Sequence, residues 1–364
     1  MRETRVMLFG SFLALVCLGI VMIYSSSGVY ALEVLGNPAY FLVRHLIFLV
    51  IGAVLMAVCM LIDYRCLQRW ARPILGIAVL LLILVLVPGI GRMVSGARRW
   101  FSLGPINFQP SEFAKIALII YLADLFSRKK GEVRSLKRGF LPVMAVMGLL
   151  CALIIKQPDL GNTFLVFVIT ISMLFIAGGK VFHIGAIFLS SLPVFGALIL
   201  AKPYRVRRII AFMNPWEDPL GVGFQLSQSQ IALGSGGFWG VGIGQSVQKL
   251  FYLPAAHTDF IFSIIGEELG FLGALAVILL FVFFIWQGIK IMKATTDPFG
   301  YYMAFGILLM LGMQVAVNIG VTNGLLPTKG LPLPFISYGG SALIFNMAVV
   351  GLLLNISRAQ ELSG

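Results

Sequence analysis

Long apolar runs recur along the chain, each close to the ~20 residues that an α-helix needs to cross a lipid bilayer. Hydrophobic residues make up 59% of the 364 residues and charged residues only 11%, whereas about a quarter of the residues in a soluble domain are charged. The sequence therefore predicts an all-α polytopic membrane protein in which residues 1–364 form one transmembrane domain. About ten helices are expected, near 7–24, 41–62, 73–88, 111–127, 140–156, 162–178, 181–201, 259–286, 299–320 and 340–357.

The placement of Lys and Arg predicts the orientation, because cytoplasmic segments of membrane proteins are enriched in these residues. If both termini are cytoplasmic, the cytoplasmic segments hold more than half of the 27 Lys and Arg residues. A long extracytoplasmic loop, about 202–258, then joins the seventh and eighth helices. The net charge of +13 has the same explanation, so it does not indicate binding to nucleic acid.

A cluster of basic residues opens this outer loop, where the orientation rule disfavours them. The stretch KPYRVRR contains Lys202, Arg205, Arg207 and Arg208. Two explanations stay equally open. The cluster is attracted to anionic lipid head groups, or it binds a pyrophosphate, whose oxygens match the forked donors of guanidinium groups.

Charged residues within apolar helices are costly in lipid and are usually functional. In QPSEFAK, Ser111 and Glu112 fit the first turn of a helix, but Lys115 lies further in. Glu112 and Lys115 are three residues apart on one helix face and can pair. In KQPDLGN, Asp159 either caps the next helix or faces an internal cavity, where it joins Glu112 and Lys115 in a charge cluster.

The stretch HTDFIFSIIGEELG, at the start of the eighth predicted helix, contains three acids. Asp259 precedes the apolar run, so it fits a helix cap, a solvated loop acid or a catalytic group at the membrane surface. Glu267 and Glu268 lie about 12–14 Å deeper if the helix is continuous. Since two adjacent acids at that depth cannot both face lipid, at least one is expected to face protein or water. Polar helix packing is their more common role.

Five stretches in a fixed order resemble the SEDS family, the shape, elongation, division and sporulation proteins. They span most of the chain from about residue 100 onward: QPSEFAK, QPDLGN, NPWEDPLGVGFQLSQSQIALGSGGFWGVGIGQSVQKL, AHTDFIFSIIGEELG and GLLPTKGLPLPFISYGGSA. Several of them are more similar to the division branch of the family than to the elongation branch. The stretch FYLPA, where division members often carry acids, departs from that pattern and leaves a sporulation protein open.

The resemblance implies a ten-helix membrane glycosyltransferase that polymerises lipid II into glycan strands. The reaction would occur at the outer face of the bacterial cytoplasmic membrane during cell division, at the septum. The resemblance also implies a class B penicillin-binding protein, a monofunctional transpeptidase, as partner, together with other division proteins. The family's essential outer-loop aspartate falls on Asp259, and its cavity charges fall on Glu112, Lys115 and Asp159.

The implied reaction joins a weakly nucleophilic sugar hydroxyl to a sugar carried on a lipid pyrophosphate. We expect Asp259 to act as the general base, because partial desolvation raises the pKa of a carboxyl group toward a useful value. No metal-ligating motif is present, and a divalent cation, Mg²⁺ or Mn²⁺, stays open as an aid to the leaving pyrophosphate. His257 would orient Asp259 or contact substrate, with an ordinary loop histidine as an equal alternative. The candidates for binding the pyrophosphate are Arg205, Arg207, Arg208 and Lys329.

Two other functions fit parts of the pattern. A lipid II flippase would use Glu112, Lys115 and Asp159 as a polar path through the membrane, but it would also need a matching polar site on the cytoplasmic side. A non-catalytic scaffold that recruits the transpeptidase would tolerate the loss of Asp259. The outer basic cluster and Asp259 favour the polymerase.

Overall fold

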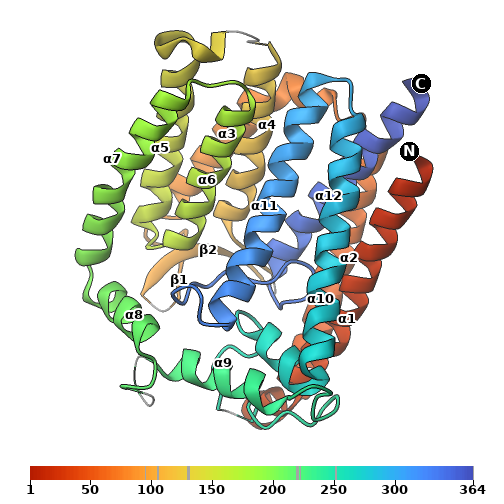
Figure 1. Ribbon diagram of the computed structural model, residues 1–364, viewed down its shortest axis with the longest axis vertical. Coiled ribbons are helices and arrows are strands. Elements are labelled where there is room, and N and C mark those ends of the chain that lie inside the picture. The colour runs from red at the N-terminus through yellow and green to blue at the C-terminus, as the bar shows by residue number, and fades with distance from the viewer. Residues whose placement is uncertain are drawn as a thin grey trace.

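The computed structural model describes residues 1–94, 96–104, 106–128, 132–218, 221, 223–250 and 252–363. Long helices run side by side through the molecule, and both termini lie at the same end (Figure 1). The helices are α1 (Arg2–Leu35), α2 (Tyr40–Leu61), α3 (Cys66–Leu84), α4 (Pro110–Arg128), α5 (Leu141–Lys156), α6 (Leu160–Ile176), α7 (Val181–Leu200), α8 (Pro203–Met213), α9 (Phe224–Ser235), α10 (Ile261–Ala294), α11 (Pro298–Thr322) and α12 (Gly340–Ser363).

Ten of the described helices, α1 to α7 and α10 to α12, occupy the ten predicted spans. Eight helices in the described part of the chain are long and apolar enough to cross a membrane. The remaining two differ for separate reasons, since α6 has only 17 residues and α4 includes charged residues such as Glu112 and Lys115. The predicted polytopic helical membrane architecture is confirmed.

Close helix packing builds the core of the bundle. The most extensive contacts join α2 to α12 and α1 to α10. Gly351 of α12 shows why a small residue is needed, because a Cβ atom there would lie 2.5 Å from the Met56 carbonyl oxygen of α2. Small residues let helix backbones approach closely in membrane proteins, where van der Waals packing drives association.

A small antiparallel sheet lies between α3 and α4, and the sequence analysis did not predict it. Its strands are β1 (Arg92–Val94), β2 (Ala97–Leu103) and β3 (Ile106–Phe108), in the order β1-β2-β3. The sheet is a small addition to a protein that is otherwise helical, as predicted. The strands are too short and too rich in Arg to stand out from a loop by periodicity.

The long loop predicted between the seventh and eighth helices contains two helices of its own. Pro203 occupies the first turn of α8, where its missing N–H costs nothing. In Figure 1, α8 and α9 lie across the end of the molecule opposite the termini. The arginines that open the loop therefore lie on α8, an amphipathic helix with two distinct faces.

Helix α10 is broken rather than continuous. Gly270 has φ 67° and ψ −168°, a conformation that essentially only glycine adopts. A Cβ atom on Gly270 would lie 2.3 Å from the Gly240 backbone nitrogen, so the outer loop passes directly against the break. Loop and helix are joined there by hydrogen bonds from the Val241 N–H to the Glu267 carbonyl and from the Gly242 N–H to the Glu268 carbonyl, each 3.0 Å long.

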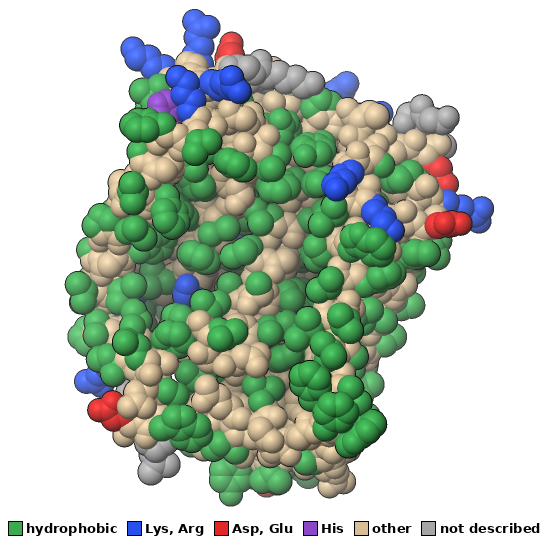
Figure 2. All heavy atoms as spheres, in the orientation of Figure 1, with side chains coloured by type: hydrophobic (Ala, Val, Ile, Leu, Met, Phe, Trp, Pro, Cys, Tyr) green, Lys and Arg blue, Asp and Glu red, His purple; other side chains and the backbone are tan. Residues whose placement is uncertain are grey.

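The surface has an apolar middle and one strongly basic end. Figure 2 shows hydrophobic side chains over the middle of the molecule and most of the Lys and Arg of this face at the end that carries the termini. Helix α7 contributes no buried residue. Phe195 packs against Phe167 of α6, while Phe182, Leu189 and Val194 are exposed.

Candidate active site

A cavity of about 580 Å³ lies at the end of the bundle opposite the termini. Its walls come from β2, the start of α6, the end of α7, helices α8 and α9, and the segment 327–330. Phe195 and Ile199 of α7 form an apolar part of the wall. The charged residues that line the cavity are Arg99, Asp159, Arg205, Arg208, Asp259 and Lys329.

Asp259 lies two residues before α10 and is partly buried. Among the residues that the structure describes, its carboxylate accepts no hydrogen bond and forms no ion pair. Burial raises the pKa of Asp259 from 3.8 to about 6, and the nearby Arg208 guanidinium opposes part of that rise. Gly330 approaches the carboxylate so closely that a Cβ atom at that position would lie 3.2 Å from Oδ2. The site therefore contains an unpaired carboxylate with a pKa of about 6.

Helix α8 divides the basic cluster between its two faces. Arg205 is buried, donates from Nη1 to the Leu198 carbonyl at 2.5 Å and stacks near the Tyr204 ring. Arg208 lies one turn further on the same face, and its Nη1 donates to the Thr328 carbonyl at 3.3 Å. Arg207 and Arg208 are both exposed, but Arg208 lines the cavity and Arg207 does not. The structure therefore brings two of the three predicted arginines to Asp259.

Two further cations complete the basic side of the cavity. The Nζ atom of Lys329 lies 4.6 Å from the centre of the Phe164 ring, and burial lowers the pKa of this amine. Arg99 of β2 donates from Nε to the Gln157 carbonyl and from Nη2 to the Pro158 carbonyl, both at 2.7 Å. Lys329 was predicted from the sequence, whereas Arg99 was not.

Asp159 caps α6 and also lines the cavity. Its Oδ1 accepts from the Asn162 backbone N–H at 3.0 Å, which caps α6, and its Oδ2 accepts from Asn162 Nδ2 at 3.0 Å and from Gln109 Nε2 at 3.3 Å. It also lines the cavity that contains Asp259. The same carboxylate therefore caps a helix and lines the cavity.

Glu112 and Lys115 pair with each other instead of facing this cavity. Lys115 Nζ lies 2.8 Å from Glu112 Oε1, and both side chains are almost completely buried. Neither residue lines the cavity, and the recorded contacts of Asp159 do not include them. The predicted cluster of three charges is therefore divided into a buried ion pair and a separate cavity-lining acid.

His257 packs among aromatic rings rather than in the cavity. Its ring centre lies 4.6 Å from that of Phe41, 5.8 Å from that of Tyr338 and 6.0 Å from that of Tyr30. Burial lowers the pKa of His257 to about 4, which keeps the imidazole neutral at physiological pH. This placement fits a packing role better than contact with substrate.

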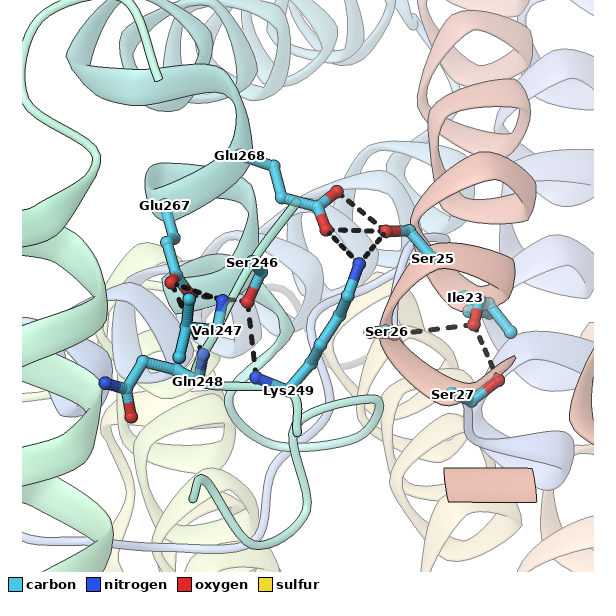
Figure 3. A network of polar contacts seen from close by, with 10 residues as sticks. All are labelled: Ile23, Ser25, Ser26, Ser27, Ser246, Val247, Gln248, Lys249, Glu267 and Glu268. Carbon is cyan, nitrogen blue, oxygen red and sulfur yellow. Dashed lines mark hydrogen bonds and ion pairs between the residues drawn. The ribbon is translucent and has the colours of Figure 1, made fainter. Parts of the chain in front are cut away.

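Glu267 and Glu268 both face protein, as the sequence analysis required of at least one. Figure 3 shows them reaching the outer loop and α1. Glu267 accepts from the Ser246 hydroxyl and from the Val247 N–H, and Glu268 Oε1 lies 2.8 Å from Lys249 Nζ. Both acids are at most 2% exposed, so this is a fully paired buried network.

Several residues of the cavity carried no clear signal in the sequence. Arg99 is one of two adjacent arginines in a strand that periodicity did not reveal. Tyr204, Phe164 and Gln225 are common residue types in membrane helices and loops. Only the amphipathic spacing of α8 could have separated Arg205 and Arg208 from Arg207, had the segment been recognised as a helix.

The fold and this cavity define a polytopic membrane protein with a cavity lined by four cations and, among the described residues, one acid without a hydrogen-bond or ion-pair partner. The family model of FtsW, RodA and SpoVE, described as "Cell cycle protein", matches residues 5–362. The chain therefore belongs to this family, which confirms the resemblance stated from its motifs.

The curated relatives include both division and sporulation proteins. A probable peptidoglycan glycosyltransferase FtsW of Trichlorobacter lovleyi is 48% identical over 350 residues, which cover 96% of this chain and 92% of the relative. Stage V sporulation protein E of Bacillus subtilis is 44% identical over 346 residues, 95% of this chain and 94% of the relative.

Solved structures share the same fold. A chain of a peptidoglycan synthase complex that coordinates polymerization and crosslinking is 31% identical, covers 97% of each chain and has a TM-score of 0.79. The rod shape determining protein RodA of Thermus thermophilus is 30% identical, covers 97% of this chain and 96% of its own, and has a TM-score of 0.72.

Proposed function

We propose that this protein is a peptidoglycan glycosyltransferase that polymerises lipid II into glycan strands during cell division. The observation that carries the proposal is the unpaired carboxylate of Asp259 in a cavity lined by four cations, Arg99, Arg205, Arg208 and Lys329. Perturbed carboxyl pKa values in clefts are characteristic of functional sites. The family membership and the names of the curated relatives support the same activity.

The cavity supplies the groups that the reaction needs. Asp259 takes the proton from the acceptor hydroxyl while the hydroxyl oxygen forms a bond to the anomeric carbon of the donor sugar. The bond between that carbon and the pyrophosphate oxygen breaks, and its electron pair leaves with the pyrophosphate. Arg205, Arg208 and Lys329 stabilise the departing negative charge. Phe195 and Ile199 provide an apolar wall for the first part of the lipid.

A divalent cation fits this site only together with substrate. The described residues contain no group of three or more His, Cys, Asp or Glu side chains placed to hold a metal ion. Mg²⁺ typically uses one or two carboxylates plus the phosphates of a substrate, and the cavity offers Asp159 and Asp259. We propose that the pyrophosphate oxygens, together with Asp159, would hold any Mg²⁺ or Mn²⁺ that accompanies the substrate, where it would add positive charge. Asp259 would remain free of metal, because a metal-bound carboxylate cannot act as the base.

The partner and the location follow from the relatives rather than from the cavity. The similar chain in the peptidoglycan synthase complex works beside a crosslinking activity, which supports a class B penicillin-binding protein as the transpeptidase partner here. We propose that the two proteins act with other division proteins at the septum. The active site would face outward from the cytoplasmic membrane, with both termini in the cytoplasm.

The two alternative functions have less support. A flippase would need a polar path through the bundle, but Glu112 and Lys115 neutralise each other in a buried pair outside the cavity. A scaffold would have no use for an unpaired carboxylate with a raised pKa. The polymerase uses both the unpaired carboxylate and the cations that line the cavity.

The deciding experiment is polymerisation of labelled lipid II by the purified protein with its transpeptidase partner. Wild type should form glycan strands, whereas Asp259→Ala and Asp259→Asn should form almost none. Equal glycan yield from all three proteins would reject the catalytic role and favour the scaffold. Translocation of lipid II in liposomes that depends on Glu112 or Asp159 would favour the flippase.

A further inference from the structure

The backbone around Asp259 is held by hydrogen bonds to three consecutive carbonyl groups. The His257 carbonyl accepts from the Tyr338 N–H at 2.9 Å, and the Thr258 carbonyl accepts from the Ser337 hydroxyl at 2.6 Å. The Asp259 carbonyl accepts from Nδ2 of Asn318 at 2.9 Å. Such a run of tertiary hydrogen bonds in a loop leaves little freedom for the side chain that it carries.

Asn318 connects this segment to the segment that contains Lys329. Its Nδ2 also donates to the Leu331 carbonyl at 2.8 Å, and the Leu331 N–H donates to the Lys329 carbonyl at 2.9 Å. Asn318 belongs to α11 and is only 2% exposed. One buried amide group on a rigid helix therefore joins the two segments that supply an acid and a cation to the cavity.

Gly330 packs closely against Asp259, so the segment that contains Lys329 has little room to move relative to the carboxylate. A Cβ atom at position 330 would lie 3.2 Å from Asp259 Oδ2. A small shift of the segment 329–331 would therefore change both the distance between the carboxylate and the Lys329 amine and the access of water to the carboxylate.

We propose that Asn318 is a positioning residue that holds the Asp259 carboxylate and the Lys329 amine in their reactive arrangement. Asn318 does not line the cavity, so it acts through the backbone of the two segments. This inference rests on the proposed glycosyltransferase function, in which Asp259 is the base. Misplacement of reacting groups by about 1 Å can lower a rate by about 100-fold.

The same observation could reflect structural support alone, and Asn355 provides a matched control. Asn355 of α12 is also a buried amide that bridges segments, since its Nδ2 donates to the carbonyls of Cys59, Met60 and Ile62. It lies at the opposite end of the bundle from the cavity. The substitution to Leu removes comparable hydrogen bonds at the two positions.

The test compares Asn318→Leu with Asn355→Leu in the complex with the transpeptidase, using labelled lipid II. Both variants should lose thermal stability. Only Asn318→Leu should lower kcat, by about tenfold or more, while KM for lipid II changes by less than about twofold. The midpoint of its pH–rate profile should move to lower pH, because a loosened Asp259 carboxylate is better hydrated.

The pH readout depends on the charged and titratable groups around Asp259, none of which is removed by either substitution. They come from β2, the start of α6, helix α8, the segment before Gly330 and the loop itself: Arg99, Asp159, Arg205, Arg208, Lys329 and His257. A changed midpoint in Asn318→Leu therefore reports the position and hydration of the carboxylate rather than a missing charge.

Ser337→Ala repeats the test if Asn318→Leu does not fold. It removes the hydroxyl that holds the Thr258 carbonyl and should lower kcat in the same direction, by about fivefold, which corresponds to the roughly 1 kcal/mol that one hydrogen bond contributes. Wild-type kcat and pH midpoint in the folded variants would overturn the inference, as would an equal loss of kcat in Asn355→Leu. Full activity of Asp259→Asn would instead reject the proposed function itself.

Discussion

Asp259 and Glu268 lie at the two ends of one short segment, residues 259–268, that includes the start of α10, but their environments are opposite. The Glu268 carboxylate is buried and paired with Lys249 and Ser25. The Asp259 carboxylate lies at a cavity and has no hydrogen-bond or ion-pair partner in the described part of the chain. Both are acids close to a membrane-spanning helix, so residue type alone does not distinguish them.

The difference separates a structural acid from a reactive one. A buried charge whose hydrogen-bonding capacity is filled has little left for a substrate, and removal of one partner destabilises the protein. A carboxylate that is partly desolvated and unpaired has a raised pKa and can accept a proton. The two acids should therefore respond in opposite ways to substitution.

Asp259→Asn should have the largest effect on activity. Loss of a general base lowers rates by about 10²- to 10⁴-fold, and glycan formation from labelled lipid II measures it. Because burial raises the pKa of Asp259 from 3.8 to about 6, the folded protein is destabilised by the ionised carboxylate as pH rises through this range. Asn removes that cost, so the melting temperature at pH 7.5 should not fall. Activity within about twofold of wild type would contradict the prediction.

Lys249→Met should have the converse effect. It leaves Glu268 buried without its cation, which typically costs about 3–5 kcal/mol of folding free energy. The melting temperature in detergent should drop, while the folded fraction keeps its activity. The double variant Lys249→Met/Glu268→Leu should recover much of the stability, because it removes the uncompensated charge. A double variant no more stable than Lys249→Met would show that the pair is not the source of the effect.

The pH dependence of polymerisation should reveal the free carboxylate. A base must be deprotonated, so the rate should rise through pH 6 and fall about tenfold per pH unit below it, in line with the pKa of about 6 for Asp259. Initial rates between pH 4.5 and 8, with the melting temperature followed in parallel, separate titration from unfolding. A flat profile across this range would indicate that Asp259 is not the base.

Arg208→Ala and Arg207→Ala provide the smallest but most local contrast. Arg208 lines the cavity and lowers the pKa of Asp259, whereas Arg207 is exposed outside it. Loss of a charged hydrogen bond costs about 1.5–3 kcal/mol, so KM for lipid II should rise about tenfold or more in Arg208→Ala only. The pH midpoint should also move upward in that variant. Equal changes in the two variants would favour a general attraction to anionic lipids.

Most of the transmembrane architecture could be predicted from the sequence. Each apolar run must satisfy its backbone hydrogen bonds internally in lipid, so run length alone predicts a helix. The sheet β1–β3 and the helices α8 and α9 were not predicted, because these segments lie outside the apolar runs. The break at Gly270 was also not predicted, since one glycine among many has no distinctive local pattern.

The candidate site was predicted in part. Asp259 and Lys329 were identified through their motifs, and Arg205 and Arg208 through the density of charge in an outer loop. Arg207 and His257 were grouped with them because proximity in sequence does not show which side of a helix or loop a side chain occupies. Arg99 was missed because it reaches the cavity through a strand that local pattern did not reveal.

The sequence by itself determined that the chain forms a helical membrane bundle of this family. It also identified Asp259 as the candidate base. These properties follow from composition, run length and ordered motifs, all of which are local along the chain. Only the tertiary structure decided which charges are paired. The pairing of Glu112 with Lys115, the pairing of Glu268 with Lys249 and the free carboxylate of Asp259 depend on which distant segments meet, because an ionisable group takes its character from its neighbours in space.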